Sequence, residues 1–329
     1  MRVVVIGGGG YLGRPLVRLL RGQADTVSAS QHRGEEVDEQ VDLRRPEEVY
    51  RLLGRVRPDV VVLTAYLLER ATAADPMRAV ETNILGVTSV FQAAADFGLR
   101  RVVFASSGAV HGADTDFQTR ALDELAPGRP TTLYGTMKVF NESIAGHYNA
   151  RFGTEIVSYR ISGPYGRGKS YERFGGEIPY DTVVAAARDK AQESARDRAR
   201  DRARDRARDK DRLVLPWSAD AQFRFIHIDD AAASFVPLVL AGRLEHRVYN
   251  APGFTVSVRQ LADAAKSISN LDCEFTEPGR PLKFVRWDAT RYEEEFNFRP
   301  LPMADWMQQE ISGAAGRDAT QRESRERKA

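Results

Sequence analysis

Short runs rich in valine and isoleucine alternate with helix-like segments through the first half of the chain, and this alternation constrains the fold most. Most of the runs lack the apolar–polar alternation of half-exposed strands, which is typical of a parallel sheet covered on both faces. They lie at Arg2–Ile6, Thr26–Ala29, Val60–Thr64, Arg101–Ala105 and Ile156–Arg160. The segments between them predict helices at Leu12–Arg21, Pro46–Gly54, Met77–Phe97 and Leu133–Phe152. Repeated βα units of this kind predict an α/β fold with a doubly wound parallel sheet.

The pattern changes after about Gly163, where glycine and proline cluster in a loop-like stretch. Shorter elements follow, and we expect them to form a smaller C-terminal α/β lobe. They are predicted at Leu213–Leu215, at Phe223–Ile228, from Asp230 onward and at Val258–Ser269. The predicted boundaries are a large domain over residues 1–162, a lobe over 163–316 and a charged tail over 317–329. Segments near 223–250 are expected to return to the first domain.

Residues 195–212 depart from the rest of the chain in composition because they repeat the tetrapeptide ARDR. Between Arg196 and Arg212 there are nine basic and five acidic residues, a net charge of +4; since the whole chain carries +2, the remainder carries −2. No apolar stripe is present that would dock this segment on a core as a helix. It is predicted to be a solvated low-complexity insertion, either helical or disordered. The alternative, an arm that binds a polyanion, is weakened by the interspersed aspartates.

Composition excludes several classes of protein. Hydrophobic residues make up 42% and charged residues 29% of the 329-residue chain, which indicates a globular protein. The net charge of +2 argues against a dedicated nucleic-acid binder. A single cysteine, Cys273, excludes an internal disulfide, and the scattered histidines lack metal-ligand spacing, so no metal site is expected. The sequence shows neither a membrane-spanning apolar stretch nor a signal-peptide pattern, so we expect a cytoplasmic protein.

The first predicted strand runs directly into a glycine-rich turn, VVVIGGGGYLG over residues 3–13. Gly7 would permit a tight turn, Gly10 would let the backbone approach a pyrophosphate, and Gly13 would let the following helix pack closely on the strand. The start of that helix would offer N–H groups and a positive dipole to phosphates. Because the turn follows the first strand of a βαβ unit, it predicts dinucleotide binding on a Rossmann-type sheet.

The end of the second predicted strand bears on the choice of dinucleotide. An acidic residue is usual there when the ribose hydroxyls of NAD are bound, but this sequence has Gln31, His32 and Arg33. Without the carboxylate a 2′-phosphate is not repelled, and Arg33 could bind it. NADP is therefore favoured over NAD, the alternative being that Arg33 is merely an exposed loop residue.

A tyrosine and a lysine four residues apart, Tyr134 and Lys138, share one face of a predicted helix. An ammonium beside a phenol lowers the pKa of the phenol, so that the tyrosine can exchange a proton near neutral pH. A serine at the end of a strand, Ser107, could hydrogen-bond the reacting oxygen. Together with the glycine-rich turn, these three residues predict hydride transfer between a carbinol carbon and a nicotinamide ring.

These motifs resemble the extended short-chain dehydrogenase/reductase superfamily, and within it the NAD-dependent epimerase/dehydratase family that contains UDP-galactose 4-epimerase. The likeness covers roughly residues 1–310 and includes GGGGYLG, Asp42-Leu43, ETNILGV, SSGAVHG, YGTMK followed by Glu142, and HIDDAA at 227–232. It implies a catalytic triad of Ser107, Tyr134 and Lys138 and a C-terminal lobe that binds substrate. It also implies a homodimer formed through helices near 80–97 and 133–150.

The residues expected to bind the cofactor and the substrate combine the motifs with this resemblance. The expected cofactor residues are Gly7, Gly10, Tyr11, Leu12, Gly13, Gln31, His32, Arg33, Asp42, Leu43, Thr64, Ala65, Tyr66, Asn83, Tyr134 and Lys138. The expected substrate residues are Ser107, Gly108, His111, Gly163, Tyr165, Arg224 and Arg280.

Departures from the family pattern narrow the range of activities that the resemblance implies. Dehydratases of the family carry an acidic pair directly after the catalytic Ser or Thr, where this chain has Gly108 and Ala109, so 4,6-dehydration is not expected. His111 replaces a usual tyrosine, and Gly163 stands where many sugar-nucleotide enzymes have an asparagine. A nucleotide-activated sugar as substrate is thus implied by the family rather than by these residues.

Three functions remain open from the sequence. The first is an NADP-dependent keto-sugar reductase, and the second is a nucleotide-sugar 4-epimerase that keeps NAD tightly bound. The third, a non-catalytic nucleotide-binding scaffold, is disfavoured because the tyrosine and the lysine are both present.

Overall fold

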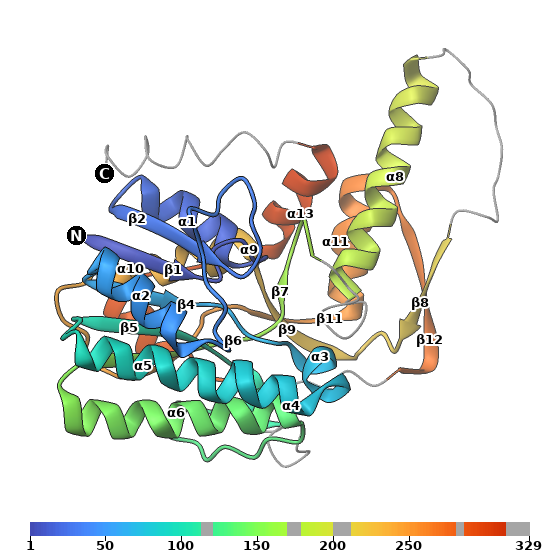
Figure 1. Cartoon of the computed structure of the whole chain (residues 1–329). Helices are drawn as coiled ribbons and strands as arrows, with labels where there is room; N and C mark the ends of the chain where they lie inside the picture. Colours follow the sequence, from blue (N-terminus) through green and yellow to red (C-terminus); the bar gives the residue numbers. More distant parts are fainter. Residues whose placement is uncertain (113–120, 170–178, 200–211, 281–285, 314–329) are drawn as a thin grey trace. The chain divides into compact units, whose positions relative to one another are not determined.

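The computed structural model describes residues 1–112, 121–169, 179–199, 212–280 and 286–313 (Figure 1). Contacts divide the chain into two compact units. The first comprises Met1–Gly176, Phe225–Gly253 and Val285–Pro300, and the second comprises Glu177–Arg224, Phe254–Phe284 and Leu301–Ala329. Two segments from beyond residue 220 therefore belong to the first unit. Each unit is described by itself below.

A seven-stranded parallel sheet forms the centre of the first unit, in the order β10-β6-β5-β4-β1-β2-β3. This confirms the predicted doubly wound parallel sheet. Its strands are β1 (Arg2–Ile6), β2 (Asp25–Ser30), β3 (Glu39–Gln40), β4 (Val60–Leu63), β5 (Arg101–Ser107), β6 (Glu155–Ile161) and β10 (Val248–Asn250). The strand order reverses direction between β1 and β4, the place where doubly wound sheets bind ligands at the carboxyl ends of their strands.

Helices cover both faces of this sheet, so its strands are apolar on both sides. In β1, Val3 and Val5 belong to one core cluster while Val4 and Ile6 belong to the other, because successive side chains point to opposite faces. The first cluster includes residues of α1, α9 and α10, and the second includes residues of α2, α5 and α6. The bounds are α1 (Gly13–Arg21), α2 (Pro46–Val56), α3 (Glu69–Ala74), α4 (Pro76–Ala79), α5 (Val87–Asp96), α6 (Leu133–Phe152), α9 (Ile228–Ala233), α10 (Phe235–Leu240) and α12 (Thr290–Phe296).

The helix predicted over Met77–Phe97 is interrupted. Residues Val80–Gly86 form a π-helical segment, η1, between α4 and α5. Apolar periodicity continues on both sides of η1, so the sequence pattern does not reveal a turn that is one residue wider. Such segments are frequent at functional sites, and this one carries Asn83.

The second unit contains α8 (Pro179–Ala199), β8 (Arg212–Trp217), β11 (Phe254–Ser257), α11 (Val258–Ser269), β12 (Asp272–Arg280) and α13 (Met303–Ser312). Strands β8 and β12 pair in parallel, and α8 packs against α11 and α13. Helix α11 has the predicted bounds and begins with a capping box of Ser257 and Gln260. The predicted insertion over 195–212 falls mostly on residues 200–211, which lie outside the described residues, as does the predicted tail. Strand β9 (Gln222–His227) crosses the boundary between the units.

No helix within the described parts of the chain is both long enough and apolar enough to cross a membrane.

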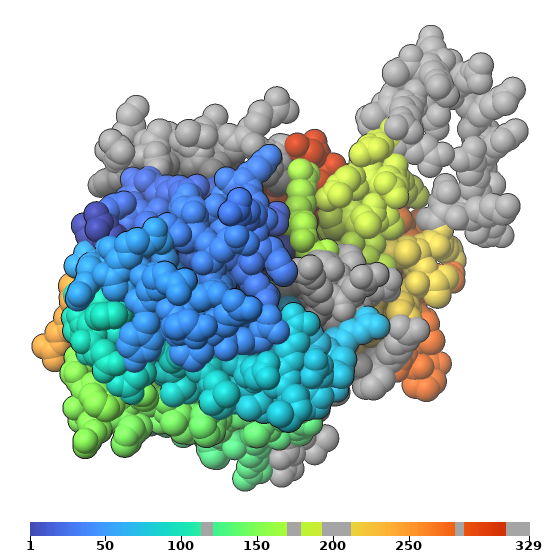
Figure 2. Space-filling model, in the orientation of Figure 1, coloured from blue at the N-terminus to red at the C-terminus, as the bar shows by residue number. Residues whose placement is uncertain are grey.

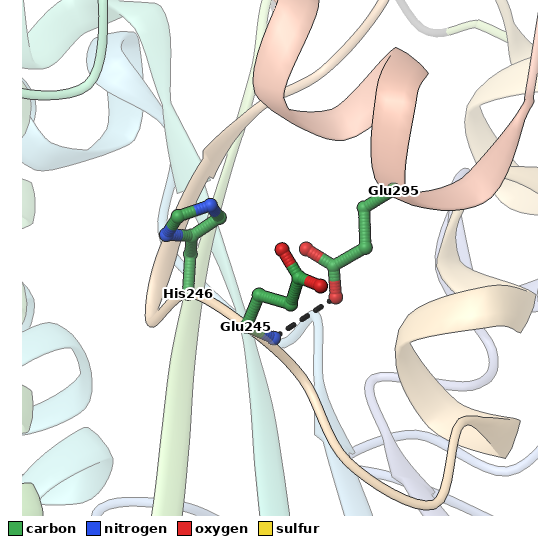
Figure 3. Close-up of side chains that lie close together, drawn as sticks. All are labelled: Glu245, His246 and Glu295. Atoms are coloured by element: carbon green, nitrogen blue, oxygen red, sulfur yellow. Dashed lines mark hydrogen bonds between the residues drawn. The ribbon is translucent and has the colours of Figure 1, made fainter.

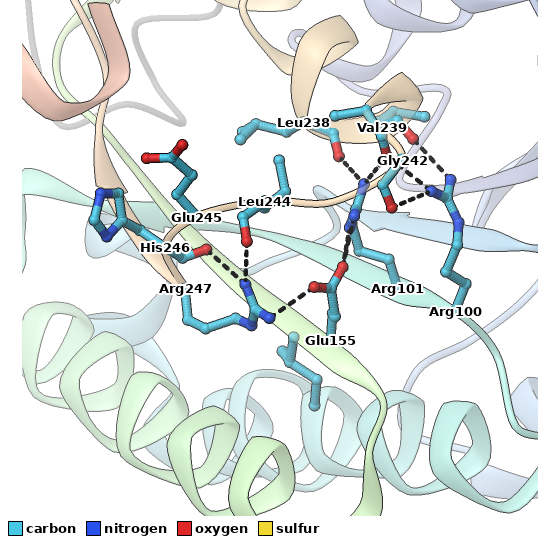
Figure 4. Close-up of polar contacts among 12 residues, drawn as sticks. Arg100, Arg101, Glu155, Leu238, Val239, Gly242, Leu244, Glu245, His246 and Arg247 are labelled. Atoms are coloured by element: carbon cyan, nitrogen blue, oxygen red, sulfur yellow. Dashed lines mark hydrogen bonds and ion pairs between the residues drawn. The ribbon is translucent and has the colours of Figure 1, made fainter. Parts of the chain in front are cut away.

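A buried ion pair joins β5 and β6 at their first residues (Figure 4). Arg101 is fully buried, donates to Glu155 from Nε at 2.8 Å and Nη2 at 2.5 Å, and donates from Nη1 to the carbonyls of Leu238 and Ala241 at the end of α10. A guanidinium at a helix C-terminus is stabilised by the helix dipole. Glu155 also accepts from Arg247 at 2.7 Å. This cluster secures the end of the sheet opposite to the carboxyl ends of the strands.

The variant Glu155→Gln should lower the free energy of unfolding by about 3 kcal/mol, because it leaves the charge of Arg101 buried without its partner. The matched control is Asp25→Asn, which removes the partner of Arg2 in a pair whose side chains are 60% and 49% exposed; it should cost less than about 1 kcal/mol. Urea denaturation of both variants measures the difference, and equal losses would contradict the structural role given to Arg101.

Candidate active site

The glycine-rich turn lies flat against the carboxyl ends of the neighbouring strands. The N–H groups of Gly7 and Gly8 both donate to the carbonyl of Ala29 in β2, at 2.7 and 3.0 Å. Gly7 has φ +99°, and a Cβ at that position would collide with Ala65 and with Thr64 Oγ1 after β4. A Cβ on Gly13 would collide with the carbonyl of Gly7. The turn is therefore possible only with glycine at these two positions, as the motif predicts.

This turn fits a dinucleotide pyrophosphate. It leads into α1 at Gly13, so backbone N–H groups and the positive end of the helix dipole face the loop. Gly10 is exposed, and only the carbonyl of Gly7 would approach a Cβ there. Tyr11 and Leu12 are half-buried, and the Tyr11 hydroxyl donates to the carbonyl of Gly166 at 3.0 Å. The turn is thereby linked to the residue that directly follows β7 (Pro164–Tyr165).

Beyond β2 the side chains that bear on the choice of dinucleotide are exposed. Arg33 donates from Nε to Gln40 at 2.9 Å, Gln31 donates to Asp42 at 3.1 Å, and His32 is exposed beside them. Hydrogen bonds from Arg44 hold the pKa of Asp42 below its ordinary value. The Asp42 carboxylate is thus already held by neighbouring side chains. Leu43, by contrast, is buried, and a Cβ on Gly86 of η1 would collide with it.

Ser107, Tyr134 and Lys138 converge at the carboxyl end of β5. Ser107 is the last residue of β5, and Tyr134 and Lys138 lie one turn apart in the first half of α6. The Ser107 side chain acts on the Tyr134 phenol as a hydrogen-bonding neighbour. The Nζ atom of Lys138 lies 5.5 Å from the centre of the Tyr134 ring. Helix α6 has the predicted bounds, so the expected i,i+4 geometry is present.

The protonation of Tyr134 is set mainly by burial. Burial raises the pKa of Tyr134 to about 12, while the hydrogen bond from Ser107 lowers it and the charge of Glu69 raises it. The expectation that Lys138 lowers this pKa differs from what the structure shows, because burial dominates over every other influence. At neutral pH the phenol is therefore protonated.

Lys138 is only 2% exposed and lies between aromatic rings. Its Nζ donates to the carbonyl of Ala105 at 2.6 Å and sits 3.3 Å from the centre of the Tyr66 ring and 4.5 Å from that of Phe104. Burial lowers the pKa of Lys138 well below its ordinary value, and the charge of Glu142 opposes this. Contacts with aromatic faces favour the ammonium form. The charge on Lys138 thus depends on the groups that surround it.

Two buried asparagines hold the elements around Tyr66. Asn83 accepts from the N–H of Leu67 at 2.8 Å and donates to the carbonyl of the same residue at 3.0 Å. Asn141 of α6 donates to the Tyr66 hydroxyl at 3.0 Å and to the carbonyl of Asn83 at 2.9 Å. Asn83 is fully buried, and its contacts tie the segment after β4 to α6, the helix that carries Tyr134 and Lys138.

Gly108 begins a short 3-10 helix, η2 (Gly108–His111), and is covered by Trp287. A Cβ on Gly108 would collide with the Trp287 ring, which is 5% exposed and donates from Nε1 to the carbonyl of Ala251 at 3.1 Å. This position has no room for an acidic side chain. No sequence signal links Trp287 to Gly108.

A buried polar cluster lies behind the three converging residues, and sequence reasoning missed it. Arg160 of β6 donates to Glu142 from Nη2 at 2.7 Å and from Nε at 3.0 Å, and its Nη1 lies 3.3 Å from His111 Nε2. Ser106 donates to the same Glu142 carboxylate at 2.5 Å. Two signals were available: a charged residue inside a buried strand, and a glutamate one turn beyond Lys138. His111 is fully buried, so its ring contacts this cluster and has no exposed surface.

The remaining predicted substrate residues fall in both units. In the first unit β7 (Pro164–Tyr165) pairs with β9, and the fully buried Tyr165 ring packs edge-on against Phe225 and His227, with centroids 4.7 and 5.2 Å apart. Gly163 precedes β7 with φ +53° and accepts from the N–H of Ile226 at 3.4 Å. Arg224 and Arg280 belong to the second unit.

One group of potential metal ligands is present among the described residues, although none was expected. Glu245, His246 and Glu295 each place a ligand atom within 4.8 Å of the others (Figure 3). The Glu295 carboxylate already accepts from the N–H of Glu245 at 3.0 Å and from the hydroxyl of Tyr249 at 2.6 Å. These bonds give Glu295 a structural role in anchoring the 245–249 segment to α12.

Comparison with known proteins identifies the family. The family model described as the NAD-dependent epimerase/dehydratase family matches residues 3–251. The chain belongs to this family. Its cofactor class is accordingly a nicotinamide dinucleotide, which the glycine-rich turn fits.

Individual relatives are similar over only part of their length. Uronate dehydrogenase of Pseudomonas putida is 35% identical over 102 residues, which are 31% of this chain and 37% of that enzyme. L-arabinose 1-dehydrogenase (NAD(P)(+)) of Haloferax volcanii is 32% identical over 171 residues, which are 49% of this chain and 66% of that enzyme. The matched part thus spans less than two thirds of the length of these curated relatives.

Solved structures share the fold across nearly the whole chain. UDP-glucose 4-epimerase of Thermus thermophilus in complex with NAD has a TM-score of 0.72 at 22% identity, covering 96% of this chain and 100% of that one. L-threonine dehydrogenase of Phytophthora infestans has a TM-score of 0.76 at 20% identity, covering 96% and 99%. At these identities the likeness shows the fold alone.

Burial makes His111 a pH-sensitive element of stability. Burial and the charge of Arg160 lower the pKa of His111 from 6.5 to about 4, so the folded protein binds fewer protons than the unfolded chain between these values. Stability is complete above about pH 6.5 and falls as the pH drops toward 4. Between pH 7 and 5 the wild type should lose about 2 kcal/mol through this group.

The variant His111→Gln should not show this loss of about 2 kcal/mol in the free energy of unfolding between pH 7 and 5. The variant His147→Gln, at an exposed histidine, should show it as the wild type does. Denaturant titrations at pH 7 and pH 5 compare the three proteins. Parallel losses in the wild type and His111→Gln would show that His111 is not held neutral in the folded protein.

Proposed function

We propose that the protein is an NADP-dependent reductase that transfers a hydride to the carbonyl carbon of a sugar-like, nucleotide-activated substrate. The observation that carries this proposal is the convergence of Ser107, Tyr134 and Lys138 at the carboxyl end of β5, at the same edge of the sheet as the glycine-rich turn after β1. A hydroxyl, a phenol and an amino group so arranged are the groups that carbonyl reduction needs to move a proton.

The residues divide this chemistry between them. The nicotinamide dinucleotide, when bound, supplies the hydride. Ser107 donates a hydrogen bond to the carbonyl oxygen and orients it toward Tyr134. Because the pKa of Tyr134 is raised to about 12, the phenol is protonated at neutral pH and can donate its proton to the developing alkoxide. Lys138 stabilises the phenolate that remains.

The cofactor would be held by the turn from Gly7 to Gly13 and by side chains at the ends of β2 and β4. These are the residues Tyr11, Leu12, Gln31, His32, Arg33, Asp42, Leu43, Thr64, Ala65 and Tyr66. Preference for NADP rests on the exposed Arg33 and on the lack of a carboxylate at the end of β2. The relative from Haloferax volcanii is named as using NAD(P), which is compatible with this preference.

A sugar-like substrate is supported by the named relatives, which include uronate and arabinose dehydrogenases and UDP-glucose 4-epimerases. In the first unit, Gly108, His111, Gly163 and Tyr165 are the residues proposed to bear on substrate recognition, and Arg224 and Arg280 of the second unit stay predictions from the sequence. Among these, the buried His111 would act indirectly, through Arg160. Trp287 leaves no room for an acidic group beside Ser107, which supports exclusion of 4,6-dehydration.

A nucleotide-sugar 4-epimerase is the second candidate. UDP-glucose 4-epimerase of Streptococcus mutans is 25% identical over 180 residues, which favours this activity as the alternative. An epimerase retains its nucleotide through desalting, whereas a reductase depends on added NADPH. The absorbance spectrum of the desalted protein therefore separates the two.

We further propose a homodimer formed through α4–α6. Exposed apolar side chains lie on these helices, whose outer surface is cyan and green in Figure 2. Met77 is 72% exposed, Leu85 59% and Phe140 44%. Burial of these side chains against a second copy would remove them from water. Sedimentation of the purified protein at the mass of one chain would refute the dimer.

Tyr134→Phe should lower kcat/KM at least about 100-fold, because the ring stays in place while the proton donor is lost. The control is Tyr148→Phe on the same helix, whose hydroxyl donates to Gln92 and which should keep its activity. NADPH oxidation is followed at 340 nm with a panel of keto sugars. Full activity of Tyr134→Phe would remove the proposed chemistry.

Arg33→Ser should raise KM for NADPH about tenfold or more and leave KM for NADH nearly unchanged, since loss of a charge-assisted contact to a phosphate costs roughly 1.5–3 kcal/mol. Arg57→Ser, a change at an arginine remote from the end of β2, should alter neither constant. If Arg33→Ser affects both coenzymes equally, Arg33 does not recognise the 2′-phosphate.

A further inference from the structure

We propose that Arg160 is a positioning residue that holds Ser107 and Lys138 in register by binding Glu142 and His111 together. This inference rests on the proposed function, since it concerns how the same three reacting groups are kept in place. Arg160 belongs to neither the cofactor nor the substrate set, and it is 6% exposed.

The first half of the argument is the connection from the sheet to α6. Ser106 and Arg160 are register partners in the adjacent strands β5 and β6, so their side chains leave the sheet on the same face. Both donate to the Glu142 carboxylate, Ser106 at 2.5 Å and Arg160 at 2.7 Å. Glu142 lies one helical turn beyond Lys138. Two strands thereby fix the rotation and the height of the helix that carries Lys138.

The second half is the connection from Arg160 to the turn after Ser107. Arg160 Nη1 lies 3.3 Å from His111 Nε2 and donates to the carbonyl of Glu124 at 3.5 Å. Because a guanidinium can only donate, Nε2 must accept, which places the proton of the neutral ring on Nδ1. His111 ends the η2 turn, which starts directly after Ser107. One guanidinium therefore contacts both the turn beside the serine and the helix that carries the lysine.

The same contacts set the charge of the site. Lys138 is faced by Glu142, on its own helix, and by the rings of Tyr66 and Tyr134. The charge of Glu69 acts on Tyr134. The groups facing Arg160 are Glu142 and His111, and Asp123 also acts on His111. Glu142 is the only carboxylate among the described residues that raises the pKa of Lys138. Removing its charge therefore lowers that pKa and discharges the lysine at a lower pH.

Removal of an ion pair that only stabilises the fold should leave the reaction unchanged. The molecule contains such a pair for comparison. Arg101 and Glu155 are register partners at the opposite ends of the same two strands, and Arg101, like Arg160, is buried (Figure 4). Loss of that pair should weaken the fold without reaching the reacting groups. Glu155→Gln is thus the matched control for Glu142→Gln.

The experiment measures kcat and the pH dependence of kcat/KM for the wild type, Glu142→Gln, Glu142→Asp and Glu155→Gln, with NADPH and the same panel of keto sugars as probes. Glu142→Gln should lower kcat at least about tenfold, as expected when reacting groups are displaced by a fraction of an ångström. The alkaline limb of the pH profile of kcat/KM should move to lower pH in this variant. Glu142→Asp should recover part of both effects, and Glu155→Gln should change only the thermal midpoint.

Two further measurements apply if Glu142→Gln does not fold or no probe turns over. Ser106→Ala removes one neutral donor and should reproduce the effects of Glu142→Gln on a smaller scale, while the exposed Ser143→Ala should not. Independently of turnover, the shifts of the thermal midpoint caused by Glu142→Asp and Lys138→Met should be non-additive.

An unshifted alkaline limb in Glu142→Gln, or additive midpoint shifts, would overturn the positioning role while leaving the proposed function intact if Tyr134→Phe is inactive. An active Tyr134→Phe would instead overturn the proposed function.

Discussion

The placement of one buried amino group determines how the rest of the site is arranged. Lys138 donates to the carbonyl of Ala105 and lies against the face of Tyr66, in surroundings that lower its pKa well below the ordinary value. In its charged form, an amino group in such a place stabilises a neighbouring phenolate strongly, because little water screens the interaction. To keep it there, the ends of β4 and β5 and the first half of α6 must meet within a few ångströms. The asparagine contacts around Tyr66 and the Glu142–Arg160 cluster both serve that requirement.

The parallel sheet uses its two ends differently. At the amino ends of β5 and β6, Arg101 and Glu155 form a buried pair that also holds the carboxyl end of α10, and no reacting group lies there. At the carboxyl ends of the same strands, the register pair Ser106 and Arg160 faces Glu142, directly behind the serine and the lysine. The same strand pairing thus supplies stability at one end and placement of the chemical groups at the other.

Much of this architecture was predictable because the signals are local. The bounds of β1 and α6 follow from an unbroken apolar run and a long helical segment ending before Gly153, and the glycine-rich turn follows from residue type alone. What could not be predicted depends on contacts between distant segments. The π-helical turn around Asn83 leaves the apolar periodicity intact, and the packing of Trp287 on Gly108 joins residues far apart in sequence. The raised pKa of Tyr134 depends on burial, whereas the Tyr–Lys spacing alone indicates a lowered one.

The central claim is that Ser107, Tyr134 and Lys138 face the reacting carbon of a bound nicotinamide ring. A crystal structure of the protein with NADP+ tests this most directly, and it requires no knowledge of the substrate. The account predicts the pyrophosphate on the Gly7–Gly13 turn, with the Ser107 and Tyr134 hydroxyls over the C4 side of the nicotinamide, leaving room for a carbonyl within about 3–4 Å of C4. A nicotinamide ring that lies away from Tyr134, or a nucleotide bound elsewhere than at the glycine-rich turn, would contradict it.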